Sequence, residues 1–418
     1  MEMAYTEVLQ RANGKVFSRR TVVPPNRLET RNWDLIAALF DVKHPGILGE
    51  LSDELKRITG RRHVFFAPSC RCAIAQVLTV LPQREVVMPA YTCPVVKTAV
   101  QIAGKRILYV DISKNSLNAT SAEYEQLAQP GRILLPTHLF GIPTDIEAIC
   151  ELARQRGCVT IEDAAASFHS RRNGKLLGTF ADFGIFSFER SKRFPSFRGA
   201  ALVVNNEDII DPACLSANRV VETKRAMPIH ELARALVYNA FTIPWLYGRF
   251  TLPQILRGYK RERALQIGGK PNEEAHSPFY TREFHPYQAS LVLRMLARLD
   301  RIRDHIALLV ATYRKAFQHT SILSFLPPEC DDSALLRFPI AFSRKQRTDI
   351  LRLALKQGLY LETNYERALP AETEYAKFPN AVAAARDIVL LPLYTALTPL
   401  AAKRLAAQVI EIGESVAA

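Results

Sequence analysis

The sequence predicts an α/β fold, with a large domain built on a mostly parallel sheet covered by helices and a smaller α+β domain at the C-terminal end. The length of 418 residues exceeds what one small core needs and suits two domains. Between residues 64 and 204, short apolar runs alternate with helical runs, which is typical of parallel strands joined by crossover helices. After residue 281, strand and helix patterns recur in a smaller unit.

The N-terminal part predicts an irregular arm and then the large domain. Residues 1–32 are polar, contain a Pro-Pro pair and form the arm, and residues 33–205 form the large domain. Apolar residues three and four positions apart predict two helices, over 34–40 and 48–58. The alternating pattern that follows predicts strands over 64–67, 85–88, 106–110, 132–136, 159–161, 183–188 and 200–204, with helices over 73–80, 94–102 and 145–156.

Residues 206–280 break this pattern and predict an insertion. Its segment 235–248 is apolar and aromatic, but it is too short to span a bilayer and is interrupted by Pro244. Two interpretations stay open: packing against the core or a second subunit, or peripheral contact with a membrane surface through residues 235–263. The second is suggested by flanking basic residues, Lys224, Arg225, Arg234, Arg249, Arg257 and Lys260.

Residues 281–418 predict a long helix and the small domain. The apolar stripe over 287–317 indicates one long helix or two. The remaining patterns predict strands over 335–342 and 359–362, and helices over 348–357, 381–388 and 401–412.

Charge and cysteine content restrict the class of partner and the compartment. The formal net charge is +14, which favours an anionic partner or reflects a solvated basic surface. No basic helix interleaved with aromatic residues stands out, so nucleic acid is not expected as a partner. Seven cysteines without a CxxC pattern predict neither a metal site nor a disulfide framework. The N-terminal residues lack signal-peptide features, so we expect a cytoplasmic protein, with peripheral contact at the inner face of the membrane left open.

Three side chains follow strand-like runs and suggest one chemistry. Asp163 comes just after the run 159–161 and precedes three alanines, which leave room for a flat ring. Ser187 and then Lys192 come just after the apolar residues 184–186. Taken singly, such an aspartate is often a helix cap and such a lysine a surface charge. Together, at the carboxyl edge of a parallel sheet, they are what pyridoxal phosphate (PLP) needs: an amine for the aldehyde, a carboxylate for the ring nitrogen and a hydroxyl for the phosphate.

The surrounding motifs resemble those of the DegT/StrS family of nucleotide-sugar aminotransferases. Residues 162–165 read E-D-A-A, and residues 178–192 are similar to the family pattern G-x-x-G-D-x-x-x-F-S-F-x-x-x-K. Further similar stretches occur in the family order, at 89–92, 136–145, 378–381 and 391–398. The resemblance covers about residues 35–415, apart from the insertion.

The resemblance implies a fold-type-I PLP enzyme, normally a homodimer with shared active sites. It implies that Lys192 forms the imine with the cofactor, that Asp163 pairs with the pyridine nitrogen and that Ser187 contacts the phosphate. Ser69, Cys70 and Arg71 match the phosphate loop at a helix N-terminus, and His138 lies in a further cofactor-binding motif. The implied reaction transfers an amino group, with glutamate as the expected donor, to the keto group of a nucleotide-linked sugar.

Several positions depart from the family pattern. Ala166 stands where the family has Gln or His near the phenolic oxygen of the cofactor, and Arg193 replaces an asparagine after the lysine. Cys93 stands where an aromatic ring commonly stacks on the cofactor, and Tyr91, two residues earlier, is a candidate replacement. Thr281 replaces the asparagine that reaches the partner's phosphate.

These departures keep two alternatives open. One is PLP chemistry on a non-sugar ketone, such as a lipid-linked or natural-product intermediate. The other, from a different class, is a non-catalytic regulatory protein on the same fold. Lysine, aspartate and serine occurring together at Lys192, Asp163 and Ser187 favour an enzyme, and a lysine at position 192 favours transamination over dehydration.

Overall fold

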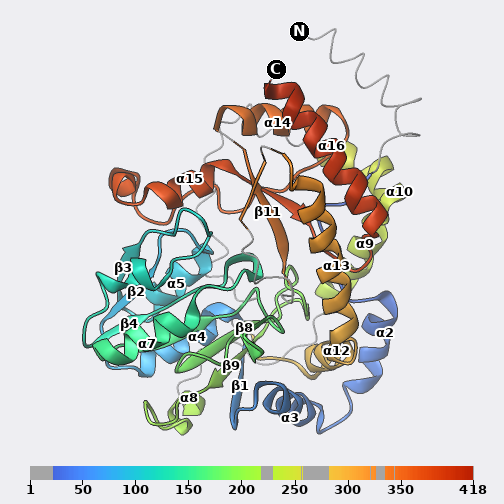
Figure 1. The fold of residues 1–418 in the computed structure, drawn as a ribbon. Helices are drawn as coiled ribbons and strands as arrows, with labels where there is room; N and C mark the ends of the chain where they lie inside the picture. Colours follow the sequence, from blue (N-terminus) through green and yellow to red (C-terminus); the bar gives the residue numbers. More distant parts are fainter. Residues whose placement is uncertain are drawn as a thin grey trace.

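The computed structural model describes most of the chain. The described residues are 22–217, 229–255, 257, 282–320, 322–325, 335–342 and 344–417. Part of the predicted arm, residues 1–21, and three of the predicted flanking basic residues, Lys224, Arg225 and Lys260, lie outside them. One unit holds a seven-stranded sheet, and a second, around β11, stands above it (Figure 1).

The seven-stranded sheet is mostly parallel, which confirms the predicted fold class. Its strand order is β1-β9-β8-β5-β4-β2-β3. The pairs β2–β3, β2–β4, β4–β5 and β5–β8 are parallel, whereas β9 runs antiparallel to both β1 and β8. The strands are β1 (His63–Ala67), β2 (Glu85–Pro89), β3 (Arg106–Val110), β4 (Arg132–Leu134), β5 (Val159–Asp163), β8 (Phe183–Ser187) and β9 (Ala200–Val204).

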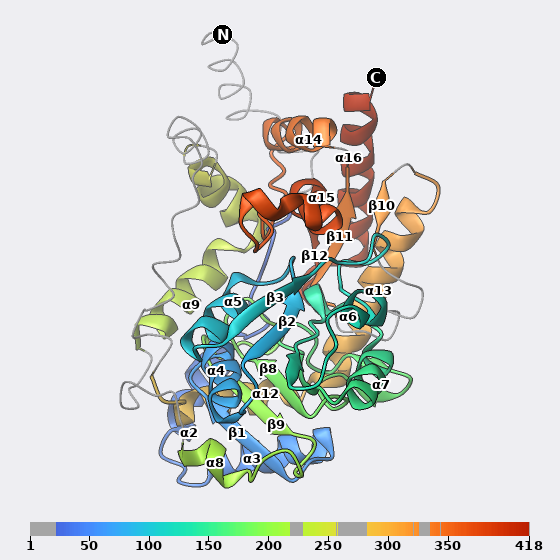
Figure 2. The ribbon, with the colours of Figure 1, turned by 90° about the vertical axis from the view of Figure 1, so that its left-hand side faces the viewer.

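Helices cover both faces of this sheet, because successive strand residues point to opposite sides. Val86 and Met88 pack in one apolar cluster with α4 (Cys70–Val80) and α5 (Pro94–Ile102), whereas Val87 packs on the other side with α7 (Ile146–Arg156). Figure 2 shows α4 and α5 on one side of the sheet and α7 on the other. The strands β5, β8 and β9 are therefore buried along their whole length.

The small domain is an antiparallel sheet covered by helices. Its strands are β10 (Leu323–Ser324), β11 (Arg337–Ala341) and β12 (Ile388–Pro392), and β11 pairs with both others. The covering helices are α13 (Leu299–Phe317), α14 (Arg344–Lys356), α15 (Pro379–Asp387) and α16 (Pro399–Ala417).

Two predictions in this domain are wrong. Residues 359–362 do not form a strand; only Glu362 makes a bridge, to Leu390. The predicted helix over 381–388 ends at Asp387, and the missed strand β12 follows directly. All five residues of β12 are buried, and a short strand buried on both faces lacks the alternation that marks a strand in sequence.

The helices near the two ends of the insertion and of the N-terminal segment pack against one another. The predicted stripe over 287–317 is two helices, α12 (Pro286–Leu296) and α13. The helix α2 (Asn32–Asp41) packs against α12 and α9 (Ile229–Phe241), and α3 (Ile47–Thr59) packs against α12. The short elements are α6 (Ser121–Glu125), η1 (Leu139–Gly141), β6 (Arg171–Arg172), β7 (Lys175–Leu176), α8 (Ala213–Ala217), α10 (Pro244–Leu246), η2 (Tyr247–Thr251) and η6 (Glu372–Lys377).

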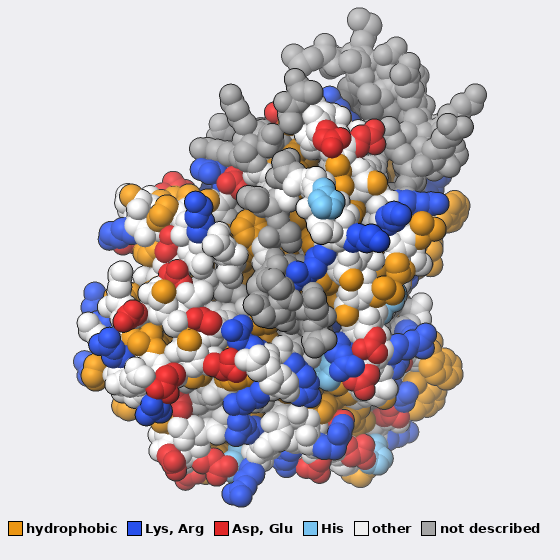
Figure 3. Space-filling view, viewed as in Figure 1, with side chains coloured by type: hydrophobic (Ala, Val, Ile, Leu, Met, Phe, Trp, Pro, Cys, Tyr) orange, Lys and Arg blue, Asp and Glu red, His pale blue; other side chains and the backbone are white. Residues whose placement is uncertain are grey.

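Large apolar side chains are exposed on α2 and on the α9–η2 segment. Trp33 and Phe40 of α2 are 72% and 78% exposed, and Trp245 of α10 is 72% exposed. Figure 3 shows hydrophobic side chains along the right-hand edge of the molecule, where Figure 1 places α2 and α10. Such a surface indicates contact with another molecule.

Candidate active site

A cavity of about 490 Å³ opens where β5 and β8 end. Of the ten side chains predicted to bind the cofactor or act on it, all except Tyr91 line this cavity. They are Ser69, Cys70, Arg71, Cys93, His138, Asp163, Ala166, Ser187 and Lys192. The fold thus brings together residues that lie up to 123 positions apart (192 − 69).

Asp163 is the last residue of the central strand β5 and is almost completely buried. Burial raises the pKa of its carboxyl group, and the Ala165 N–H and the charge of Lys192 offset part of that rise. The Ala165 N–H donates to Oδ1 at 3.0 Å. A buried carboxylate with so few donors gains most from a cationic partner that enters the cavity.

Ser187 and Lys192 lie on the turn that leaves β8. The hydroxyl oxygen of Ser187 accepts a hydrogen bond from the Glu189 N–H at 3.3 Å, and the Lys192 N–H donates to the Glu189 carbonyl oxygen at 2.9 Å. These bonds hold the turn compact. Lys192 is half-buried and lines the same cavity as Asp163, so its amine and the carboxylate face one ligand volume.

Arg193 anchors this turn to the rest of the molecule. Its buried guanidinium pairs with Glu29 at 2.7 Å and donates to the carbonyl oxygens of Leu393, at 3.1 Å, and Leu335. The departure from the family pattern at this position therefore has a structural role. It ties the turn that carries Lys192 to the N-terminal segment and to the small domain.

The N-terminus of α4 forms an anion-binding end of the cavity. Ser69 is the N-cap, and its hydroxyl oxygen accepts from the Cys72 N–H at 3.3 Å. Cys70 and Arg71 form the first turn and line the cavity. First-turn N–H groups lack partners within the helix and carry the positive end of its dipole. Burial, followed by the charge of Asp163, raises the pKa of the Cys70 thiol, so the neutral thiol does not repel a phosphate.

Glu162 has a structural role that sequence reasoning missed. Its fully buried carboxylate accepts from the Gly178, Phe180 and Ala181 N–H groups at 2.5, 3.0 and 3.3 Å, and from His138 Nε2 at 2.8 Å. His138 Nδ1 accepts from the Thr144 N–H at 3.1 Å, so the ring proton is on Nε2. Glu162 thus holds the His138 ring against the cavity wall. Its place in the E-D-A-A motif was the signal that could have revealed this.

We expect Glu162→Ala to lower the free energy of unfolding by about 3 kcal/mol, because it leaves four donors, three of them buried, without their acceptor. Urea unfolding of the variant and the wild type measures this. Glu147→Ala is the control, since Glu147 accepts from Arg172 and Asn173 at the surface and should change stability by less than about 1 kcal/mol. Equal losses in the two variants would contradict the assignment.

Tyr91, the candidate replacement for the stacking ring, is not among the side chains that line the cavity. It is fully buried, and its hydroxyl donates to the Asn364 carbonyl oxygen at 3.2 Å. Its ring packs edge-on against Tyr365, with centroids 6.1 Å apart. Tyr365 is the tyrosine that lines the cavity beside Cys93, and it stacks on Phe140 at 5.8 Å. The small domain supplies this ring, which no nearby motif indicated.

Further charged residues reach the cavity. Arg198 is fully buried, and burial lowers the pKa of its guanidinium to about 10. It donates to the carbonyl oxygens of Glu283, at 3.2 Å, and Arg282. Arg337 pairs with Glu362 at 2.8 Å, and Arg190 lies two residues before Lys192. The cavity is therefore rich in cations, as an anionic ligand requires.

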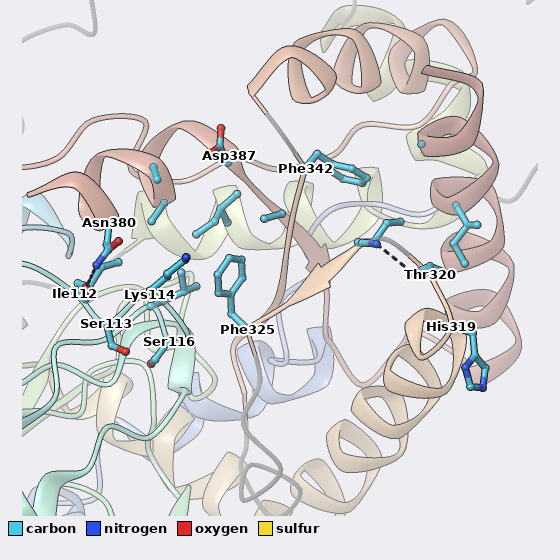
Figure 4. Close-up of a pocket in the computed structure, with 18 of the residues that line it drawn as sticks. Ile112, Ser113, Lys114, Ser116, His319, Thr320, Phe325, Phe342, Asn380 and Asp387 are labelled. Atoms are coloured by element: carbon cyan, nitrogen blue, oxygen red, sulfur yellow. Dashed lines mark hydrogen bonds between the residues drawn. The ribbon is translucent and has the colours of Figure 1, made fainter. Parts of the chain in front are cut away.

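A second cavity, of about 640 Å³, lies between the loop after β3 and the small domain (Figure 4). Lys114 and Ser116 come from the loop, and Phe325 and Asp387 from the small domain. The Asn380 side chain donates to the Ile112 carbonyl oxygen at 2.9 Å across the junction. None of the ten predicted residues lines it, so the chemistry belongs to the smaller cavity.

The smaller cavity fits pyridoxal phosphate. Its volume lies in the range of small-molecule sites. It presents one lysine amine, one buried carboxylate and a helix N-terminus, which match the aldehyde, the ring nitrogen and the phosphate. Ala165 and Ala166 line it without filling it.

Comparisons with known proteins agree with this fold. A pleiotropic regulatory protein of Geobacillus stearothermophilus is 22% identical over 331 residues, which cover 77% of this chain and 76% of that protein. A GDP-perosamine synthase of Escherichia coli O157:H7 is 32% identical over 228 residues, covering 53% of this chain and 62% of the relative. The solved structure of NtdA from Bacillus subtilis, with bound PMP cofactor, has a TM-score of 0.69 at 19% identity, covering 96% of this chain and 87% of that chain.

The family match covers most of the chain. The model of the DegT/DnrJ/EryC1/StrS aminotransferase family matches residues 48–235 and 268–410. All ten residues predicted for the site lie within the first range, whereas residues 236–267 of the predicted insertion lie outside the match. The resemblance drawn from the motifs is thereby confirmed: the chain belongs to the DegT/DnrJ/EryC1/StrS aminotransferase family, and it is a pyridoxal-phosphate-dependent aminotransferase.

Proposed function

We propose that this protein transfers an amino group from glutamate to the keto group of a nucleotide-linked sugar. The observation that carries the proposal is a single cavity that holds Lys192, the buried carboxylate of Asp163 and the N-terminus of α4. When bound there, pyridoxal phosphate supplies an electron sink for the reacting carbon.

Each side chain of this cavity has one task in the proposed reaction. The amine of Lys192 first acts as a general base and removes the proton from the Cα of the amino donor. It later acts as a general acid and gives the proton back. The carboxylate of Asp163 keeps the ring nitrogen protonated. Ser69 and Ser187 donate their hydroxyls to the phosphate, together with the first-turn N–H groups of Cys70 and Arg71.

A nucleotide-linked acceptor suits both the charge of the site and the relatives. Beyond Lys192 the cavity wall carries Arg190 and Arg337, and the chain as a whole has a net charge of +14. The relative that is 32% identical is named a GDP-perosamine synthase, a nucleotide-linked product. A cationic cavity favours a nucleoside diphosphate over a neutral ketone.

A lipid-linked or other non-sugar ketone is the second candidate acceptor. The observation that favours it is the α9–η2 segment, residues 229–251, part of which lies outside the family match. This segment lines the cavity with Tyr238 and exposes Trp245 and Phe250.

Product analysis of the purified protein separates the two candidates. PLP-loaded protein and glutamate are incubated with nucleotide-linked keto sugars, and in parallel with lipid-linked ketones. We expect an amino sugar and 2-oxoglutarate in the first set only. Amino transfer confined to the second set would overturn the nucleotide-sugar acceptor while leaving the aminotransferase chemistry intact.

We further propose that the active form is a homodimer. The exposed apolar side chains of α2, Trp33, Ile36 and Phe40, offer a surface that a second copy would bury. Sedimentation of the purified protein measures the mass, and a monomer at the concentration used for activity assays would exclude the dimer.

We also propose a cytoplasmic location with peripheral contact at the membrane. Within the described ranges, none of the cysteines Cys70, Cys72, Cys93, Cys150, Cys158 and Cys214 is in a disulfide, which suits a reducing compartment. No helix in the described ranges is long and apolar enough to cross a bilayer. Trp245 and Phe250 are exposed, and Arg234, Arg249 and Arg257 of the same stretch of sequence are exposed as well, an aromatic and basic combination that suits an anionic lipid surface. Co-sedimentation with phosphatidylserine vesicles tests the contact, and equal recovery with neutral vesicles would contradict it.

A further inference from the structure

Arg190 is an exposed cation at the mouth of the active-site cavity. It follows Ser187 on the turn that leaves β8, and its N–H donates to the Phe197 carbonyl oxygen at 3.2 Å. None of the carboxylates in the described ranges pairs with it, although it lines the cavity together with Lys192. Its backbone is thus fixed while its charge is available to a ligand.

Tyr238 of α9 holds the guanidinium of Arg190 in place. The guanidinium carbon of Arg190 lies 5.7 Å from the centre of the Tyr238 ring, within the range of a cation–π contact. The Tyr238 hydroxyl donates to the Asn26 carbonyl oxygen at 3.1 Å, which fixes the ring. Both Tyr238 and Asn26 line the cavity. Two segments far from the cofactor motifs therefore form its outer wall.

The other cationic side chains of the cavity are paired, deeply buried or assigned to the reaction. Arg337 is buried and paired with Glu362, and Arg71 and Arg198 are buried deep within the protein. Lys192 is assigned to the reaction itself. Arg190 is consequently the cation best placed for the part of a substrate that extends out of the cavity.

We propose that Arg190, positioned by Tyr238, binds the diphosphate of the acceptor and so selects nucleotide-linked ketones. The proposal rests on the proposed function. The carboxylate of a small donor is bonded to the carbon that reacts at Lys192, so it lies deep in the cavity. The phosphate of a sugar nucleotide is separated from the reacting carbon by the sugar ring and lies farther out, where Arg190 is exposed. A guanidinium binds phosphate through paired N–H groups.

The test measures binding of GDP and UDP to the PLP-loaded protein by titration calorimetry. We expect Arg190→Gln to weaken nucleotide binding about 10- to 100-fold, as for loss of a charged hydrogen bond. Tyr238→Ala should weaken it about 3- to 10-fold, and Tyr238→Phe less, because the ring remains. Arg249→Gln is the matched control: Arg249 is also exposed and lies 6.0 Å from the Phe250 ring, but it does not line the cavity.

Steady-state kinetics identify which substrate Arg190 contacts. Arg190→Gln and Tyr238→Ala should raise the KM for the nucleotide sugar and leave the KM for glutamate unchanged. A raised KM for glutamate with unchanged GDP and UDP binding would assign Arg190 to the donor carboxylate and overturn the proposal. Wild-type protein that neither binds nucleotide nor aminates nucleotide sugars would overturn the proposed function itself. If the wild type aminates those sugars but Arg190→Gln changes neither nucleotide binding nor the KM for the nucleotide sugar, the role of Arg190 is overturned and the proposed function stands.

Discussion

Replacing Lys192 with alanine is expected to lower the rate of amino transfer by about 10⁴-fold or more, because the amine both bonds to the cofactor and moves the proton. The same change should remove the absorbance band near about 410–430 nm that the lysine-bound cofactor gives. Absorbance spectra of the wild type and the variant after reconstitution with PLP measure the second effect independently of activity.

Lys175→Ala is the control for the lysine substitution. Lys175 lies on the β7 strand, where its amine is 4.3 Å from the centre of the Phe180 ring, and it is exposed and outside the cavity. The control should keep both the band and the rate. A band that persists in Lys192→Ala, or one that is absent from reconstituted wild type, would remove Lys192 from its assigned role.

Replacing Asp163 with asparagine is expected to lower the rate by about 10²- to 10⁴-fold, because the amide cannot keep the ring nitrogen protonated. The same change should stabilise the cofactor-free protein at neutral pH. Burial raises the pKa of Asp163 above its unfolded value, so the folded protein binds the proton more tightly than the unfolded chain does. The stability contributed by this group is full below the unfolded pKa and is lost as pH rises through the folded pKa.

The pH dependence of unfolding checks this sign. Cofactor-free wild type should lose stability relative to Asp163→Asn as pH rises from about 4 towards neutral. Asp182→Asn is a contrasting variant, because the Asp182 carboxylate accepts hydrogen bonds from the Thr160 N–H at 2.8 Å and from the Thr160 hydroxyl at 2.7 Å. This substitution should lower the stability of the protein. Loss of stability in Asp163→Asn at neutral pH would show that the carboxylate is satisfied without a ligand.

Local patterns predicted the large domain well, because its strands and helices bury apolar faces with clear periods. The runs at 106–110 and 200–204 match β3 and β9 in full, and the helix over 94–102 matches α5. The small domain was harder to predict. β12 is a wholly buried strand that directly follows α15, so the helical period appeared to continue through Ile388.

The sequence by itself determined the family, the fold class and most of the side chains that line the cavity. Asp163, Ser187 and Lys192 end or follow strands of one parallel sheet, and the carboxyl ends of such strands meet at one edge. Only the tertiary structure decided which distant segments complete the cavity. It places Tyr365 at the wall in place of Tyr91, and it brings Tyr238 of α9 onto Arg190. The physical reason is that these contacts depend on how separate helices and strands pack together. Local periodicity predicts the helices and strands themselves but not their packing.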